Sequence, residues 1–118
     1  MRAPLLVVLL AVSAGSARAD RWAWDDETSE LEVRNFFSDP SQQFFAGRWS
    51  ATRGKWRVRY SEHELCVMTA GRVVLESASG ERASFGPGDA FVVPAGFVGT
   101  WEVVEDCSKI YAIFEARS

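Results

Sequence analysis

Hydrophobic residues along most of this chain occur in short runs that alternate with polar residues and end at glycine or proline. Runs of this kind, rich in valine, phenylalanine, tryptophan and tyrosine, are typical of β-strands. No segment sustains the hydrophobic period of an amphipathic helix. The pattern therefore predicts an all-β chain with strands at 31–37, 44–51, 55–60, 64–69, 72–77, 82–85, 90–93, 100–104 and 109–115.

Tight turns separate these runs. We expect hairpin turns at Ser79-Gly80 and at Gly86-Pro87-Gly88, because glycine and proline favour the backbone angles of turns. Many short strands with frequent turns indicate a sandwich or a small barrel, and closure of the sheet also removes exposed edges.

Residues 55–60 alternate strictly between cationic and apolar side chains. Neighbouring residues of a strand point to opposite faces, so the apolar set turns inward and the cationic set outward. The inward set is Trp56, Val58 and Tyr60, and the outward set is Lys55, Arg57 and Arg59. The two arginines fit a solvated outer face better than an anion-binding pair.

The amino terminus has the pattern of a secretory signal peptide. A positive start is followed by an apolar run at 5–12, which is too short to span a bilayer. Small residues then end at Ala17-Arg18-Ala19, which predicts a signal peptide at 1–19 with cleavage after Ala19. An uncleaved anchor is the alternative. An acidic arm at 20–30 and one barrel domain at 31–118 would follow.

Charge and cysteine content narrow the possible partners. The full chain carries a net charge of −3, and removal of residues 1–19 with their two arginines leaves 11 basic and 16 acidic residues, or −5. This balance argues against nucleic acid and against a membrane surface after cleavage. We expect a secreted, periplasmic or lumenal protein. Its two cysteines, Cys66 and Cys107, could pair there, but we expect two free thiols.

Two stretches resemble the sequence motifs of the cupin family. In the first, Glu64 is followed after six residues by Gly71, and in the second, Gly88 is followed after five residues by Pro94 and then by Gly96. The chain is most similar to small single-domain cupins of the (S)-ureidoglycine aminohydrolase-like type. The sequence segments that carry this resemblance are Tyr60-Ser61-Glu62-His63-Glu64-Leu65-Cys66, Gly71-Arg72, Pro87-Gly88-Asp89, Pro94-Ala95-Gly96-Phe97, Gly99-Thr100-Trp101-Glu102 and Lys109-Ile110-Tyr111.

This resemblance implies a small antiparallel, jelly-roll-like β-barrel in a single domain. It also implies where a metal-binding member would place its ligands. A His-x-His pair shortly before the glutamate would fall on Val58 and Tyr60 or on the neighbouring arginines, and a later histidine would fall on Gly99. Only Glu64 remains of the usual set, and one carboxylate cannot hold a divalent ion. We therefore expect no bound metal and no cofactor.

Glu64 is the candidate for interior chemistry. It shares a strand face with Cys66 and Met68, and a carboxylate in such surroundings needs a partner. Lys109 is the best candidate for an ion pair, with Tyr60 as a hydrogen-bond donor. Glu64 is then either half of a structural ion pair or a catalytic acid or base with a raised pKa.

Other residues of the motifs are interpreted as follows. Trp101 either plugs the core or forms a stacking wall for a ligand, in an aromatic pocket with Trp49 and Tyr60. The thiol of Cys66 should stay protonated, since its strand face holds no base. His63, the sole histidine, should be exposed.

Three functions are compatible with these residues. The first is metal-free binding of a small polar molecule by Trp49, Tyr60, Glu64, Trp101 and Lys109. The second is a metal-dependent hydrolase of the ureidoglycine type, whose ligands this chain mostly lacks. The third is a structural or dimerisation module, because apolar residues lie on both faces of 64–69 and 109–115.

Overall fold

A computed structural model of the protein describes residues 30–116. This part of the chain contains no helix long and apolar enough to cross a membrane. The predicted signal peptide, its cleavage site and most of the predicted arm lie outside the described residues. The strands are β1 (Leu31–Ser38), β2 (Phe44–Ala51), β3 (Gly54–Arg59), β4 (His63–Ser77), β5 (Arg82–Phe85), β6 (Ala90–Val93) and β7 (Val98–Phe114).

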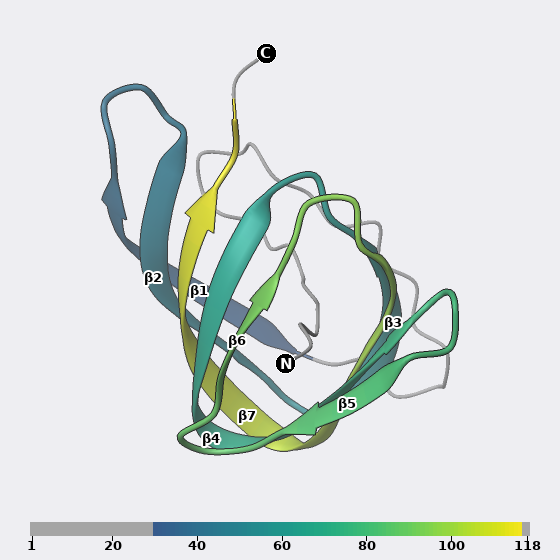
Figure 1. Cartoon of the computed structure of the whole chain (residues 1–118). Helices are drawn as coiled ribbons and strands as arrows, with labels where there is room; N and C mark the ends of the chain where they lie inside the picture. Colours follow the sequence, from purple (N-terminus) through teal and green to yellow (C-terminus); the bar gives the residue numbers. More distant parts are fainter. Residues whose placement is uncertain (1–29, 117–118) are drawn as a thin grey trace.

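The strands form one antiparallel sheet that curls into a barrel (Figure 1). Its main path runs β1-β2-β7-β4-β5, while β3 pairs with β7 and β6 pairs with β4. The long strands β4 and β7 pair with each other along most of their length; β2 and β3 pair with β7, β5 and β6 pair with β4, and β1 pairs with β2. The predicted all-β antiparallel fold is confirmed.

In two places, a pair of predicted strands forms one continuous strand in the structure. The segments 64–69 and 72–77 both belong to β4, and 100–104 and 109–115 both belong to β7. The sequence-based division was wrong because Ala70-Gly71 marks a bend rather than an end. The register shifts between Met68 and Val73, and Gly71 has a positive φ of 80°. β-Bulges of this kind bend a strand without terminating it.

One predicted hairpin is confirmed and the other is not. Ser79-Gly80 closes the β4–β5 hairpin, with the Gly80 amide donating to the Ser77 carbonyl at 2.9 Å. Gly86-Pro87-Gly88 is a turn, but the strands that it joins do not pair with each other. β5 pairs with 73–76 of β4 and β6 with 64–67, because the bend in β4 separates its two halves.

The core follows the alternation that the sequence predicts. Trp56, Val58 and Tyr60 are buried, and Arg57 and Arg59 are exposed. The inward residues of β2, β4, β6 and β7 complete this core, and polar groups are buried in it as well. Three polar or charged residues are buried among the described residues: Glu62, Glu64 and Lys109.

Candidate functional site

The five residues predicted to line a site come together inside the barrel. Trp49 lies on β2, Tyr60 directly follows β3, Glu64 lies on β4, and Trp101 and Lys109 lie on β7. Each is at most 2% exposed. The register places Lys109 opposite Trp49 on one side and opposite Met68 on the other, so the lysine points inward between β2 and β4.

A buried ion pair forms the centre of this cluster. Lys109 Nζ lies 2.8 Å from Glu64 Oε2, and the Tyr60 hydroxyl donates to Glu64 Oε1 at 3.0 Å. The partners expected for Glu64 are therefore the ones that it has. The lysine also donates to Cys66 Sγ at 3.4 Å. Both carboxylate oxygens are engaged by side chains of the barrel itself.

Two indole rings flank the ammonium group. Lys109 Nζ lies 4.6 Å from the ring centroid of Trp49 and 4.4 Å from that of Trp101. The two indoles meet edge to face, with centroids 5.4 Å apart. A cation over an aromatic face is stabilised by the ring quadrupole, most strongly where water is excluded. The rings thus supplement Glu64 in offsetting the cost of burying the lysine.

Burial and pairing act in opposite directions on the two charges. Burial raises the pKa of Glu64, and the neighbouring ammonium and Tyr60 hydroxyl offset part of that rise. Burial alone would lower the pKa of Lys109, but the carboxylate of Glu64 and the hydrogen bond to Cys66 outweigh burial and raise it. The lysine therefore stays protonated, and its charge favours the ionised form of the Glu64 carboxylate against the effect of burial.

Cys66 has a cation beside it, which the sequence-based interpretation did not foresee. The thiol nevertheless stays protonated, as expected, because burial raises its pKa well above the ordinary value and Glu64 raises it further. Cys107 is also buried, and both cysteines are free thiols. Neither has the environment of a reactive nucleophile.

Two buried hydrogen-bond donors have no acceptor. The indole Nε1 atoms of Trp49 and Trp101 are inaccessible and make no hydrogen bond to any group of residues 30–116. A buried tryptophan N–H normally finds a partner, and each exception calls for an explanation such as a bound water or ligand. These two donors belong to the rings that flank Lys109. The contacts within the cluster therefore do not explain how these two N–H donors are satisfied.

The residues present do not fit a metal ion. The carboxylate of Glu64 already faces the ammonium of Lys109, which supplies the positive charge beside it. Gly99 offers no donor, and His63 is exposed, with Nδ1 accepting a hydrogen bond from the Ala95 amide at 3.0 Å. Within residues 30–116, no group of three or more histidine, cysteine, aspartate or glutamate side chains is placed to hold a metal.

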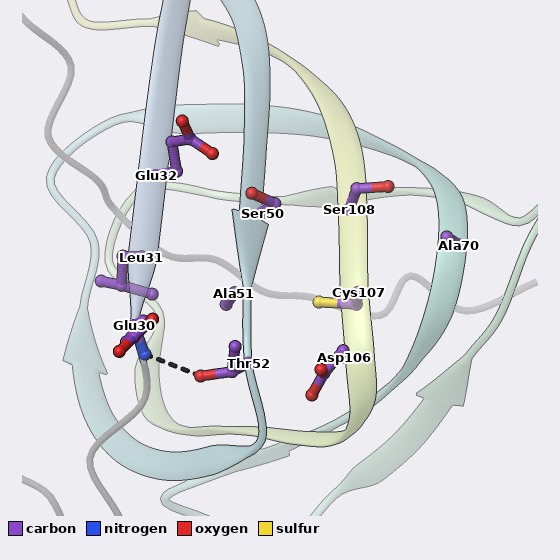
Figure 2. A pocket seen from close by; sticks show the side chains of 10 residues that line it. All are labelled: Glu30, Leu31, Glu32, Ser50, Ala51, Thr52, Ala70, Asp106, Cys107 and Ser108. Carbon is purple, nitrogen blue, oxygen red and sulfur yellow. Dashed lines mark hydrogen bonds between the residues drawn. The ribbon is translucent and has the colours of Figure 1, made fainter.

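Two hollows of the barrel surface lie away from this cluster. One, of about 540 Å³, opens between β1, β2 and β7 and is lined by carboxylates and hydroxyls, including Glu32, Asp106 and Ser108 (Figure 2). Another, of about 400 Å³, is lined by residues of β3, β4 and β7, including Arg57 and Glu76. None of the five predicted site residues lines either hollow. Trp101 packs against Trp49 and Phe91, as the core-plug interpretation requires.

Glu62 and Tyr111 are polar core residues that sequence reasoning missed. Glu62 is 2% exposed, and burial raises its pKa to about 7, with the charges of Glu115 and Glu64 adding to the rise. Tyr111 donates to Asn35 Oδ1 at 2.8 Å, and burial raises its pKa to about 12. Strand alternation could have identified Tyr111, whereas no local signal marks Glu62, which lies between strands.

A family model described as the EutQ-like cupin domain matches residues 38–111 of this chain. Three solved structures are among those with a similar fold. The EutQ protein of Clostridium difficile superposes with a TM-score of 0.67 at 16% identity over 75% of this chain. A DUF861-family protein of unknown function from Pseudomonas syringae superposes with a TM-score of 0.69 at 24% identity over 83% of this chain. A putative ethanolamine utilization protein Q from Salmonella typhimurium superposes with a TM-score of 0.66 at 13% identity over 99% of this chain.

The shared regions differ in extent between these relatives. The match covers 65% of the Clostridium protein and 45% of the Pseudomonas protein, but 100% of the Salmonella protein. No curated protein matches this chain. At these identities the similarity establishes a cupin-type, jelly-roll-like β-barrel and leaves the chemistry to the residues of this chain.

Proposed function

This chain belongs to the EutQ-like cupin domain family, and we propose that its barrel binds a small neutral molecule that carries a hydrogen-bond acceptor. The observation that carries this proposal is the pair of buried indole N–H groups of Trp49 and Trp101, which have no acceptor. The two rings pack edge to face and neither surface hollow reaches them, so a ligand must separate the rings before its carbonyl or similar oxygen can accept from their N–H groups. An unsatisfied buried donor costs on the order of 1–3 kcal/mol, which binding would recover.

The ion pair favours a neutral ligand over a charged one. Glu64 and Lys109 neutralise each other inside the barrel, so neither charge is left to attract an ionic group. An anion or cation entering the same space would have to lose its hydration without a counter-charge. Small amides, ureides and sugars fit this requirement better than organic acids.

Both oxygens of Glu64 accept hydrogen bonds from the barrel, one from Tyr60 and one from Lys109. This arrangement favours binding over acid–base catalysis, since a base must reach the proton that it removes. It also speaks against a metal-dependent hydrolase. The resemblance to (S)-ureidoglycine aminohydrolase-like cupins supports ureides as the first ligand class to examine. We propose that the barrel binds them and does not hydrolyse them.

We propose further that the protein is exported and acts after residues 1–19 are removed. The support is the apolar run followed by Ala17-Arg18-Ala19. Mass spectrometry of protein isolated from its native host should then find a chain that begins at Asp20. A mature chain that retains Met1 and Arg2 would contradict export by this route.

The binding proposal is tested by following the indole N–H resonances of the protein by NMR. The sequence contains five tryptophans, and Trp49→Phe and Trp101→Phe identify the two signals that matter. Titration with acetamide, methylurea or glucose should shift both signals and raise the melting temperature, whereas acetate should do neither.

Trp56→Phe is the matched control. This tryptophan is also buried, but its indole nitrogen is not among the donors without an acceptor. The control should keep the ligand response that Trp49→Phe and Trp101→Phe weaken. The proposal is wrong if no neutral compound moves the two resonances, or if each indole N–H shows a permanent contact to one buried water.

A further inference from the structure

The chain that enters the barrel at Glu30 comes from the direction of β3. β1 runs antiparallel to β2, with Leu31 opposite Ala51, so the residues before Leu31 lead away from β1 toward β3. The pairing already extends beyond the first residue of β1. The Thr52 amide donates to the Glu30 carbonyl at 3.1 Å, and the Glu30 amide donates to Thr52 Oγ1 at 2.7 Å. A strand that continued this pairing would run on from Thr52 along β3.

β3 continues the line of β2 at this edge of the sheet. Both strands pair with β7, β2 at 107–114 and β3 at 98–103, and both lie on the side of β7 that is opposite β4. β1 pairs with the side of β2 that faces away from β7. The corresponding side of β3 is therefore the continuation of the edge along which β1 pairs.

The outer face of β3 and the segment before Glu30 carry opposite charges. The residues of β3 that alternate with its buried residues are all cations: Lys55, Arg57 and Arg59. Three consecutive residues shortly before Glu30 are all acidic: Asp25, Asp26 and Glu27. Opposite charges on neighbouring strands attract each other, whereas like charges in those positions repel.

Continuing the pairing one residue for one residue beyond Glu30 sets 23–28 against 54–59. Directly opposite residues of two paired strands point to the same face of a sheet. The outward pairs in this register are Glu27 with Lys55 and Asp25 with Arg57. Each acidic residue of these pairs therefore meets a cation.

The same register suits the inward residues. Trp24 would point to the core-facing side of β3, and Asp26 would come opposite Trp56, whose indole N–H is a suitable donor for a carboxylate. A slip by one residue in either direction would turn Trp24 outward and both Asp25 and Glu27 inward. The apolar and the charged residues favour the same alignment.

We propose that residues 23–28 form a strand along the side of β3 that faces away from β7, with outward ion pairs between Glu27 and Lys55 and between Asp25 and Arg57. The segment is long enough, because the ten residues 20–29 extend over about 33 Å and β3 over about 20 Å. The occupant is this chain's own segment, since its connection at Glu30 holds it beside β3 at a high effective concentration. The proposal does not depend on a ligand inside the barrel.

Hydrogen exchange of the full chain, followed by mass spectrometry, tests the docking. Amides of 23–28 should exchange at least roughly ten-fold more slowly than those of a synthetic peptide of residues 20–30, because a docked strand bonds them to the barrel. Arg57→Glu should lower this protection by about five-fold, since it replaces an attraction by a repulsion. Adding Asp25→Arg to Arg57→Glu should restore the protection, because the exchange of charges forms the pair again.

Arg48→Glu is the matched control. Arg48 is an exposed cation of β2 whose cross-strand neighbours are Arg34 and Ile110, so it does not face 23–28. Its substitution should leave the exchange of that segment unchanged.

Engineered cysteines test the register. Asp25→Cys with Arg57→Cys should cross-link within one chain, whereas Asp25→Cys with Arg59→Cys should not. Directly opposite Cβ atoms lie about 5 Å apart, but diagonal ones lie about 7–8 Å apart, beyond the reach of a disulfide. The two native cysteines are buried and should not interfere.

Three outcomes would overturn the proposal: exchange of 23–28 as fast as in the free peptide, equal losses of protection in Arg57→Glu and Arg48→Glu, or cross-links that join two chains instead of closing within one. If circular dichroism shows that Arg57→Glu does not fold, Lys55→Glu with and without Glu27→Lys provides the same test at the neighbouring pair.

Discussion

Replacing Lys109 by methionine should destabilise the barrel far more than replacing both members of the ion pair. Lys109→Met keeps the length of the side chain but leaves the Glu64 carboxylate buried at 2% exposure without its counter-charge. Loss of one partner of a buried pair costs about 3–5 kcal/mol. For a domain of this size, that cost corresponds to a drop in melting temperature on the order of 20 °C.

The double variant Glu64→Gln/Lys109→Met should recover most of that loss. It removes both charges, and exchange of a buried pair for neutral groups of similar volume is often nearly neutral. The coupling between the two positions, obtained from urea unfolding of the wild type, both single variants and the double variant, should therefore be about 2–4 kcal/mol.

The pH dependence of Lys109→Met supplies an independent check. Burial already raises the pKa of Glu64, and loss of the ammonium raises it further, so the folded state binds a proton that the unfolded state releases. The variant should be least impaired near pH 4 and lose stability as the pH rises. Equal losses in the single and double variants at every pH would refute the idea that the pair acts as a unit.

Three other consequences of the structure can be measured directly. Burial raises the pKa of Glu62 to about 7, above its unfolded value, so this residue should lower the stability by about 2 kcal/mol between pH 5 and 8. Glu62→Gln should reduce the fall seen in thermal melts by that amount, and an unchanged fall would contradict the assignment. Gly99→Ala should cost roughly 2–3 kcal/mol in urea unfolding, because its new methyl group would overlap the backbone oxygen of Glu76; an unchanged midpoint would show that the strands can move apart. Cys66 and Cys107 should react with a thiol reagent only after denaturation, since both are buried with raised pKa values, and rapid labelling of the native protein would contradict this assignment.

The strands could be predicted from the sequence, but their continuity could not. Alternation fixed which residues of 55–60 face the core, because side-chain period is a local property of a strand. The bend near Gly71 has the same sequence signal as a turn, since both place glycine at a positive φ. Only the pairing of β4 with β7 on both sides of the bend distinguishes a bulge from a chain reversal.

The candidate site, like the strands, could be predicted only in part from the sequence. Electrostatics predicted the partners of Glu64, because a carboxylate among apolar residues requires a cation and Lys109 was the best placed. Sequence reasoning could not predict that the cluster would be packed rather than hollow. Whether Trp101 lines a pocket or fills it depends on how closely β2 and β7 bring two indoles together, at 5.4 Å between centroids.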